Sequence, residues 1–215
     1  MEKIIIFGAS GHAGVVIDII EKQEKYDILG IFVDTPEMQG IKYMGYPILG
    51  RIDNFYGSNK GIVAIGDNFS RQLIVNKIKE MKKDFQFATA IHPGAIIGKN
   101  VNLGEGTVIV AGSVINANSI IGKHCIINTQ SSVDHDVTIG DFSTVAPGSQ
   151  IGGKSNIGTL STISMGANVI QKINIGNGSL IGAGSTVIRN IPDGVLAFGT
   201  PAKVIRQREP NEKYM

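Results

Sequence analysis

Apolar residues recur at every sixth position from the middle of the chain onward. From Ala95 to Asn190 the sequence divides into sixteen hexads without an insertion or deletion, and the third residue of every hexad is Ile, Val or Leu. Six residues turn an α-helix by about one and two-thirds turns, which would scatter these side chains around its surface. In a parallel β-helix each hexad forms one short strand and a corner, and the third residue points into a stacked core. The period therefore predicts an all-β parallel β-helix.

The hexads also predict which residues become neighbours. Three hexads make one triangular turn, so residues 18 apart are expected to stack at about 4.8 Å, the spacing of neighbouring strands. Eight hexads carry Gly at their fourth position. We expect these glycines to form tight corners with positive φ, which glycine adopts without steric cost.

The first part of the chain has a different pattern. A β-rich apolar run in residues 3–7 breaks at Gly8–His12 and is followed by apolar residues at helical spacing. Further strands are predicted at residues 28–33 and 61–65, and a helix at about 69–81. Strand, glycine turn and helix open a nucleotide-binding α/β unit. We therefore predict three parts: an α/β Rossmann-like domain over 1–90, the β-helix over 91–206, and a polar, frayed tail over 207–215.

The strand ends of the first domain carry possible binding loops. In a parallel sheet these ends meet at one edge, so the loops at residues 8–12, 34 and 66–68 are expected to converge. The glycines of the first loop read G-x-x-G-x-x-G, not the strict G-x-G-x-x-G of NAD enzymes. A tight strand-to-helix turn without a ligand remains an alternative to a phosphate or nucleotide site. Nothing downstream resembles the substrate domain of a hydride-transferring enzyme.

Composition narrows the choice of function. The net charge of +2 is too small to indicate a nucleic-acid partner. Cys125 is the one cysteine, which excludes internal disulfides and a Cys-rich zinc motif. There is no signal peptide and no apolar run near the roughly 20 residues of a membrane helix, so we expect no membrane span and a cytoplasmic location. His124 and His135 are not separated by a multiple of 18, and no metal site is expected.

His135 stands out because two acids flank it, Asp134 and Asp136. A carboxylate beside a corner histidine can hold one tautomer and make the ring a better proton acceptor. One turn further along, Gly153 would leave open space beside the ring and expose a backbone N–H, which can stabilise an oxyanion. A base and a bare donor are the minimum for acyl transfer. A solvated histidine without a function remains the alternative.

Motifs along almost the whole chain resemble those of one family. The segments are GASGHAG after the first strand, AIGDN at the end of the third, IHPGA before the repeat, NTQSSVDHD within it, and FGTPAKVIR near the end. In this order they resemble the PglD/NeuD-type sugar acetyltransferases of the hexapeptide-repeat, left-handed β-helix superfamily. The resemblance implies an acetyl-CoA-dependent enzyme that forms a homotrimer, with active sites between neighbouring coils.

The resemblance also implies roles for individual residues. It makes His135 the catalytic base, Asp136 its orienting acid, Asn128 a further residue of the site and Gly153 the donor to the acetyl carbonyl. The nucleotide of a UDP- or GDP-linked sugar would be held by a set of N-terminal residues: Gly8, Ser10, Gly11, His12, Asp34, Gly66 and Asn68. The residues considered for contacts with acetyl-CoA are Thr144, Gly153, Lys203 and Arg206.

Two departures from the family pattern matter. Thr144 stands where some members have a histidine that contacts the acetyl donor, which leaves that contact open. Asp136 is shorter than the glutamate that is frequent at its position, so Asp134 remains an alternative orienting acid.

Three functions are compatible with these residues. The first is N-acetylation of a nucleotide-linked amino sugar, expected to be a 4-amino-4,6-dideoxyhexose, for bacterial glycan biosynthesis. The second is O-acetylation of a sugar such as sialic acid. The third is a non-catalytic trimeric β-helix that binds nucleotides. The N-terminal loops favour the first over the second, and His135 with Gly153 one turn further along disfavours the third.

Overall fold

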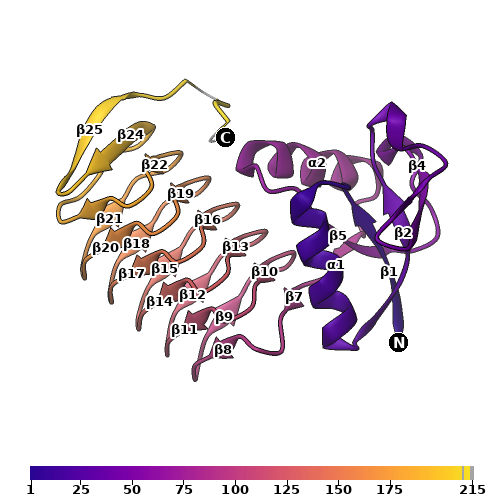
Figure 1. The fold of residues 1–215 in the computed structure, drawn as a ribbon, viewed down its shortest axis with the longest axis horizontal. Coiled ribbons are helices and arrows are strands. Elements are labelled where there is room, and N and C mark those ends of the chain that lie inside the picture. The colour runs from indigo at the N-terminus through magenta and orange to yellow at the C-terminus, as the bar shows by residue number, and fades with distance from the viewer. Residues whose placement is uncertain (210, 214–215) are drawn as a thin grey trace.

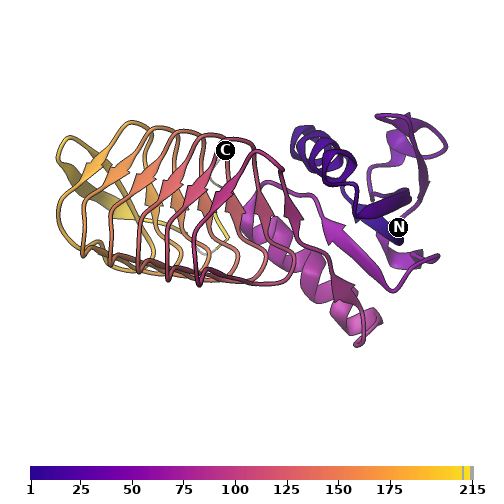
Figure 2. The ribbon, with the colours of Figure 1, turned by 90° about the horizontal axis from the view of Figure 1, so that it is seen from below.

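The computed structural model describes residues 1–209 and 211–213. The α/β domain and the stacked coils of the β-helix lie side by side along the long axis of the molecule (Figure 1). Seen from below, the rungs of the β-helix stack in register, and the N-terminal domain lies beside the first rungs (Figure 2). Both parts that the sequence predicts are therefore present.

A six-stranded sheet forms the centre of the N-terminal domain. Its strands, in spatial order, are β3 (Lys42–Tyr43), β4 (Tyr46–Gly50), β2 (Tyr26–Phe32), β1 (Glu2–Phe7), β5 (Lys60–Val63) and β6 (Gln86–Phe87). The sheet is parallel apart from the hairpin that β3 and β4 form. Ile4 and Ile6 pack on one face of β1, whereas Ile5 and Phe7 pack on the other. Because both faces of the sheet are covered, β1 is a continuous apolar run.

Helices lie against the two faces of this sheet. Helix α1 (Gly11–Gln23) buries its apolar side on the face of Ile4, and α2 (Asn68–Met81) buries Val75 and Ile78 on the opposite face. Asp67 caps α2, because its carboxylate accepts a hydrogen bond from the Ser70 amide at 2.8 Å. Two short 3₁₀ turns, η1 (Pro36–Met38) and η2 (Ile52–Asn54), lie in the connections after β2 and β4.

The β-helix consists of three parallel sheets around one core, each built from every third hexad. The first sheet contains β7 (Ala90–Ile91), β10 (Val108–Ile109), β13 (Ile126–Ile127), β16 (Thr144–Val145), β19 (Thr162–Ile163) and β22 (Leu180–Ile181). The second contains β8 (Ile96–Ile97), β11 (Val114–Ile115), β14 (Ser132–Val133), β17 (Gln150–Ile151), β20 (Asn168–Val169) and β23 (Thr186–Val187). The third contains β9 (Asn102–Leu103), β12 (Ile120–Ile121), β15 (Thr138–Ile139), β18 (Asn156–Ile157) and β21 (Asn174–Ile175). Paired residues are 18 apart, which confirms the predicted turn.

The third position of the hexad fills the core, as predicted. From Ile109 to Val187 every residue at this position is at most 4% exposed. Ile97 lies in the first turn and is 37% exposed, because one side of its rung has no further coil to cover it. The first hexad position is also buried and is mostly serine. The Ser143 hydroxyl, for example, donates to the Gly158 carbonyl at 2.6 Å and accepts from the Ser161 amide at 3.0 Å, which joins successive rungs.

The expected role of the fourth-position glycines was wrong. Their φ angles are not positive; the left-handed residues occupy the sixth position instead, among them Asn118, His124 and Asp136. Glycine is needed at the fourth position because the next rung is too close for a side chain. A Cβ on Gly140 would lie 2.6 Å from the Thr159 amide nitrogen. Close approach, and not backbone freedom, accounts for this part of the repeat.

The ends of the β-helix extend beyond the sixteen hexads. At the start, β7 pairs with β10, so the first rung begins at Ala90, the last residue of the predicted N-terminal domain. At the other end, β24 (Val195–Gly199) continues the first sheet and pairs antiparallel with β25 (Ala202–Gln207). The predicted tail is not frayed where it begins, because the Arg208 amide bonds the Gly194 carbonyl at 2.7 Å. Residues 210, 214 and 215 of that tail lie outside the described residues.

Candidate active site

His135 lies at the corner between the second and third sheets, just after β14. Half of its side chain is exposed, and its Nδ1 lies 2.7 Å from Asp136 Oδ2. Hydrogen bonds from His135 and Asn118 hold the pKa of the Asp136 carboxyl below its usual range. An ionised carboxylate at this distance favours the tautomer with a proton on Nδ1, so that Nε2 is the free proton acceptor.

The two acids that flank His135 have different hydrogen-bond partners. The Asp134 carboxylate accepts from the His135 backbone amide at 2.8 Å and from Asn116 Nδ2 at 2.9 Å, and it does not contact the ring nitrogen that Asp136 engages. Hydrogen bonds from Asn116, His135 and Gly153 lower the pKa of Asp134. Asp136 is therefore the acid that orients the imidazole, and Asp134 fixes the turn of the chain at the corner.

Gly153 lies beside the imidazole of His135, as the 18-residue spacing predicts. A Cβ at Gly153 would lie 2.8 Å from His135 Nε2 and 2.9 Å from Cε1, so any larger residue would collide with the ring. A backbone hydrogen bond from Gly153 is the smallest of the causes that lower the pKa of Asp134. The role of the Gly153 amide as a donor to an oxyanion stays a prediction.

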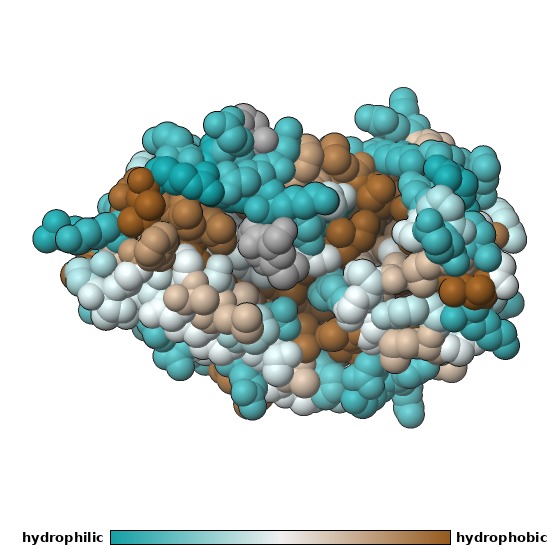
Figure 3. Space-filling model, turned by 45° about the horizontal axis from the view of Figure 1, so that its top comes forward, coloured by the Kyte–Doolittle hydropathy of each residue, from teal (hydrophilic) through white to brown (hydrophobic). Residues whose placement is uncertain are grey.

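A cavity of about 600 Å³ separates the start of α1 from the outer surface of the first sheet. The α/β domain contributes Gly11, His12, Val15 and Gly66. The β-helix contributes a mostly apolar wall: Ile126, Asn128, Thr144, Ala146, Pro147, Ser164, Met165, Leu180, Gly182 and Ala183. The molecule is hollowed between the two domains on the side shown in Figure 3, with apolar side chains at the bottom of the hollow.

His12 is the buried polar group of this cavity. Its Nε2 is inaccessible to solvent and has no hydrogen-bond partner among the described residues. Burial, with a smaller effect from the Arg71 charge, lowers the pKa of His12 to about 4. A buried nitrogen without a partner costs stability unless a ligand group completes it. His12 is therefore neutral at pH 7 and suited to hydrogen-bond a ligand in the cavity.

The other predicted residues of the first loop form the turn that leads into α1. Gly8 has a φ of 109°, and a Cβ there would lie 3.0 Å from the Ala64 carbonyl oxygen, so the turn needs glycine. Ser10 precedes α1 without capping it through its side chain, and its carbonyl accepts from the Tyr43 hydroxyl at 2.8 Å. The space around Gly11 is open. Together these residues expose the N-terminal end of α1, where backbone N–H groups favour anions.

Asn128 and Thr144 lie on the cavity side of the β-helix, away from His135. Asn128 follows β13 at the corner between the first and second sheets, and its Oδ1 accepts from the Thr129 amide at 2.8 Å. Thr144 is 1% exposed, and its hydroxyl donates to Asn68 Oδ1 at 2.6 Å. Within one chain neither residue meets His135, although the sequence analysis groups Asn128 with the catalytic residues.

Asn68 connects the two domains and is not free to hold a substrate with its side chain. It is 4% exposed, and its Nδ2 lies within hydrogen-bond distance of the Leu160 and Ser161 carbonyls and of Thr162 Oγ1. Its Oδ1 accepts from Thr144 and from Arg71. Both polar atoms of the Asn68 side-chain amide are thus used at the domain interface, and a contact between Asn68 and the substrate stays a prediction for its backbone alone.

Arg71 is a part of this junction that the sequence analysis missed. Its guanidinium is 1% exposed and donates to the Ile65, Gly66, His124 and Phe142 carbonyls at 2.7 to 3.0 Å. Two of these carbonyls belong to the α/β domain and two to the β-helix. Arg71 therefore fixes the Gly66 loop, one wall of the cavity, against the coil. Arg71 lies three residues after Asn68 on helix α2, and this spacing places the two side chains on the same side of the helix. That spacing could have indicated that the two residues act together.

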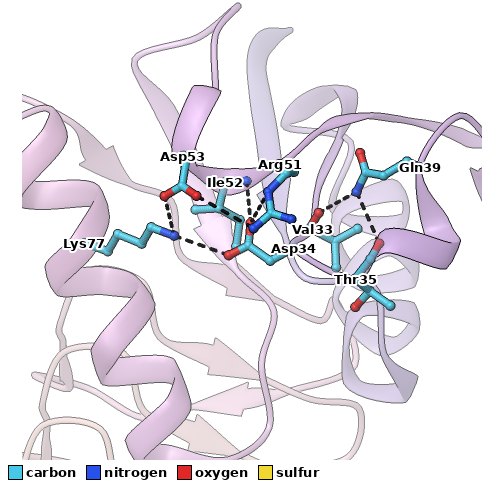
Figure 4. Close-up of polar contacts among 8 residues, drawn as sticks. All are labelled: Val33, Asp34, Thr35, Gln39, Arg51, Ile52, Asp53 and Lys77. Carbon is cyan, nitrogen blue, oxygen red and sulfur yellow. Dashed lines mark hydrogen bonds and ion pairs between the residues drawn. The ribbon is translucent and has the colours of Figure 1, made fainter.

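Asp34 follows β2, which ends at Phe32, and protein groups already occupy its carboxylate (Figure 4). Oδ1 accepts from the Ile52 amide at 3.0 Å, and Oδ2 accepts from Lys77 at 3.3 Å. Lys77 also pairs with Asp53 at 2.6 Å, and Arg51 lies 4.0 Å from Asp34. Asp34 does not line the cavity between the domains. It holds the loops after β2 and β4 to helix α2.

The two cations considered for CoA differ in their surroundings. Arg206 on β25 makes a two-pronged ion pair with Glu212, at 2.9 Å from Nη1 and 2.7 Å from Nη2. Lys203 is exposed on the same strand. Among the described residues, no group of three or more His, Cys, Asp or Glu side chains could hold a metal ion. No helix in the described part of the chain is long and apolar enough to cross a membrane.

The two halves of the predicted site lie on opposite sides of one β-helix. The cavity occupies the outer surface of the first sheet, whereas His135 lies at the corner where the second and third sheets meet. In a three-sided prism that corner is the one opposite the first sheet. A single chain therefore brings His135, Asp136 and Gly153 together, and separately brings Gly11, His12 and Gly66 near Asn128.

Both domains match known families. Residues 3–78 match the PglD N-terminal domain, and residues 118–153 match the bacterial transferase hexapeptide family (six repeats). PerB from Caulobacter crescentus, crystallised with CoA and GDP-perosamine, is 36% identical with a TM-score of 0.88 over 96% of this chain and 98% of that chain. The chain belongs to the PglD-type family of sugar acetyltransferases. The predicted fold, a Rossmann-like domain before a left-handed β-helix, is thereby confirmed.

Other PglD-type relatives differ in how far they align. The acetyltransferase domain of PglB from Neisseria gonorrhoeae FA1090, solved with acetyl coenzyme A, is 30% identical with a TM-score of 0.86. That alignment covers 95% of this chain and 99% of the other. UDP-N-acetylbacillosamine N-acetyltransferase of Bacillus subtilis (strain 168) is 35% identical over 114 residues, which are 51% of this chain and 52% of that protein. The alignment thus spans about half the length of this curated relative.

Proposed function

We propose that this PglD-type protein transfers the acetyl group of acetyl-CoA to the amino group of a nucleotide-linked amino sugar, with His135 as general base. The observation that carries this proposal is the corner of the seventh hexad. There an imidazole is oriented by Asp136 at 2.7 Å, and its free Nε2 faces a residue without a side chain. The solved relatives that bind CoA, acetyl coenzyme A and GDP-perosamine support the choice of donor and acceptor.

The reaction would proceed by direct transfer in a ternary complex. The sugar amine attacks the thioester carbonyl carbon while His135 Nε2 removes a proton from the nitrogen. Asp136 stabilises the imidazolium that forms. The Gly153 amide is the nearest donor for the tetrahedral oxyanion, and it would share its N–H between this oxygen and Asp134. Collapse of the intermediate expels the CoA thiolate, and the proton on His135 yields free CoA thiol. Cys125 is fully buried and its pKa is raised to about 12 by burial, so it supplies no acyl-enzyme.

The separation of the two half-sites supports an oligomer. If the cavity holds the nucleotide sugar, the base must come from another copy, because His135 of the same chain lies on the far side of the prism. Contact between the first sheet of one copy and the opposite corner of the next is heterologous, and such contacts form a ring where the rotation between copies closes. A homotrimer, which the family resemblance implies, satisfies this requirement. Light scattering on the purified protein would measure the number of copies.

The nucleotide sugar would lie with its charged part at the start of α1. Gly11 and the N-terminal amides of α1 suit the phosphates, and the neutral His12 suits a polar group of the sugar. Lys203 on β25 remains a proposed contact for the phosphates of CoA, as does Arg206 if it releases Glu212. The name of one relative includes a GDP-linked sugar and that of another a UDP-linked sugar. The assay below therefore determines whether the nucleobase of the substrate is guanine or uracil.

A thiol-release assay tests the function. Wild-type protein is mixed with acetyl-CoA and, in turn, UDP-linked amino sugars, GDP-linked amino sugars and sialic acid. We expect turnover with a nucleotide-linked amino sugar, and a loss of kcat of roughly 100-fold or more in His135→Ala. If sialic acid were the one acceptor that gave turnover, the acceptor group would be a hydroxyl and not an amine. Activity of His135→Ala within a few-fold of wild type would contradict the role of His135.

A further inference from the structure

A column of polar side chains runs along the corner that carries Asp136. At the sixth hexad position, successive turns contribute Asn100, Asn118, Asp136, Lys154 and Lys172, and all five have positive φ. Asn100 Nδ2 donates to Asn118 Oδ1 at 3.1 Å, and Asn118 Nδ2 donates to Asp136 Oδ1 at 3.3 Å. Asp136 Oδ2 then engages His135. Each oxygen of the carboxylate thus has its own partner.

The direction of the Asn118 amide follows from its two neighbours. An ionised carboxylate is only an acceptor, so the side of Asn118 that faces Asp136 must be the NH₂ group. Its oxygen is then the atom that faces Asn100, which is the arrangement observed. The two contacts require the same orientation, and the column holds the NH₂ group in place beneath the Asp136 carboxylate.

Without Asn118, Asp136 would have a competing partner. Lys154 stands one turn above Asp136 in the same column, and its charge already contributes to lowering the pKa of that carboxyl. The Asp136 side chain is 41% exposed. Loss of the bond from below would leave the carboxylate free to rotate toward Lys154 or water. The Nδ1 atom of His135 would then lose its acceptor.

We propose that Asn118 is a positioning residue for the transfer reaction, because it holds the Asp136 carboxylate against Nδ1 of His135. The inference rests on the proposed function of His135 as the base. Asn118 touches no reacting atom and acts through Asp136. The proposed active site thereby includes Asn118, which lies one full turn of the coil before Asp136.

The test replaces the amide without disturbing the backbone. Asn118→Gly is suitable because glycine occupies the same hexad position, with positive φ, at Gly106 and Gly112. Asn118→Asp has the shape of asparagine but faces Asp136 with a second negative charge. Asn118→Gln is the conservative variant, since Gln130 has a φ of 54° at the equivalent position. The measurements are kcat, both KM values and the pH dependence of kcat/KM with acetyl-CoA and the acceptor found above.

Three controls come from the same corner. Lys172→Gly changes the same column two turns above Asp136 and is expected to behave as wild type. Asn100→Gly removes the bond below Asn118 and is expected to change kcat by less than about twofold, since it acts through one more exposed hydrogen bond. Asn116→Ala removes the partner of Asp134 and not that of Asp136. It should leave the pH profile unchanged.

We expect Asn118→Gly to lower kcat by about threefold to tenfold with both KM values unchanged, as for loss of an exposed hydrogen bond to a charged group. The pH profile of kcat/KM should differ from that of wild type, because the Asp136 carboxylate is no longer held against Nδ1. The charged groups near this corner are Asp134, Asp136 and Lys154, and the variant changes the position of Asp136 alone. Asn118→Asp should lose more activity than Asn118→Gly, and Asn118→Gln should recover part of it.

Two results would overturn the inference. One is a wild-type kcat and pH profile in Asn118→Gly. The other is a loss of kcat with an unchanged pH profile that is equal in the Gly, Asp and Gln variants, as expected of general destabilisation. His135→Ala is measured in the same series. If it stays active, the proposed function has failed; if it is inactive while Asn118→Gly matches wild type, only the role of Asn118 has failed.

Discussion

His124 and His135 occupy corners of the same β-helix, eleven residues apart, but their environments are opposite. His124 is 3% exposed, its ring stacks on Phe142 at 5.0 Å between centroids, and Phe87 packs edge-on at 4.6 Å. Burial lowers the pKa of His124 to about 4. His135 is half exposed, has an acid at 2.7 Å and has Gly153 beside its ring.

The residue one turn away accounts for much of this difference. Phe142 stands one turn above His124 and closes its corner, so that the histidine becomes part of the domain junction. Gly153 stands one turn above His135 and leaves that ring accessible. A corner of the coil is therefore a packing site or a reactive site partly according to the residue that lies 18 positions further along the sequence. Substitutions of Phe142 and Gly153 test whether these neighbours decide the role of each histidine.

Filling the open corner should have the largest effect. Gly153→Ala would place a methyl group 2.8 Å from His135 Nε2 and force the imidazole to turn. A displacement of about 1 Å in a reacting group can cost roughly 100-fold in rate, and we expect a fall in kcat of that order. Thermal unfolding should change little, because the exposed ring can move toward solvent. An active variant with wild-type kcat would mean that the free space at this position has no role.

Opening the closed corner is the reverse experiment. Phe142→Gly keeps a backbone that glycine tolerates, since Phe142 has a φ of 59°. Removal of a half-buried ring from the junction should lower the free energy of unfolding by about 2 kcal/mol, less than for a fully buried phenylalanine. Urea denaturation at pH 7.5 measures this loss. Phe142→Leu, which keeps an apolar contact, is the matched control and should lose less stability.

The pH dependence of stability should follow from the buried imidazole. The folded pKa of His124 is about 4 and lies below the unfolded value near 6.5, so below pH 6.5 the unfolded state binds more protons. Stability is therefore lost as the pH falls from 6.5 toward 4. His124→Phe should reduce the loss between pH 7.5 and 5.5 by about 1 kcal/mol.

Denaturation at the two pH values provides the measurement. His12, whose pKa is lowered in the same direction, still titrates in both proteins and cancels in the comparison. An identical pH dependence in wild type and His124→Phe would mean that the pKa of His124 is the same in the folded and the unfolded states.

The smallest effect is expected at the end of the coil. Arg206→Gln breaks the exposed pair with Glu212, which should change stability by less than about 1 kcal/mol. If Arg206 also contacts a phosphate of CoA, KM for acetyl-CoA should rise a few-fold while kcat stays constant. Lys203→Gln on the same strand is the parallel variant. An unchanged KM for acetyl-CoA in both variants would mean that β25 does not contribute to the binding of acetyl-CoA.

The repeat made the β-helix predictable in detail, because a period of six and a turn of 18 convert positions in the sequence into neighbours in space. The same spacing correctly placed Gly153 beside His135. Applied in the other direction, it would also have found Asn116 below Asp134 and Asn118 below Asp136. The fourth-position glycines were misread because a composition pattern does not distinguish positive φ from lack of space.

Contacts between the domains had no such spacing to reveal them. Asn68 was assigned to the substrate because it ends a strand of a nucleotide-binding unit, yet its amide is consumed by carbonyls more than 90 residues away in the sequence. Asp34 was assigned for the same reason and instead pairs with Lys77. The hairpin of β3 and β4 was not predicted from the sequence either. Local patterns predicted the elements, and tertiary partners decided what each strand-end residue does.

The central claim is that each active site combines the cavity of one copy with His135 of another. Two inactive variants test it: His135→Ala, which lacks the base, and Ala183→Trp, which fills the cavity from an exposed position. Co-expression in equal amounts with different tags, followed by isolation of the mixed assemblies, allows sites that pair an intact cavity with an intact His135. In a trimeric ring every mixed assembly has one intact site out of three, so the isolated mixed assemblies should regain about a third of the wild-type activity. Mixed assemblies as inactive as their parents would contradict a shared site.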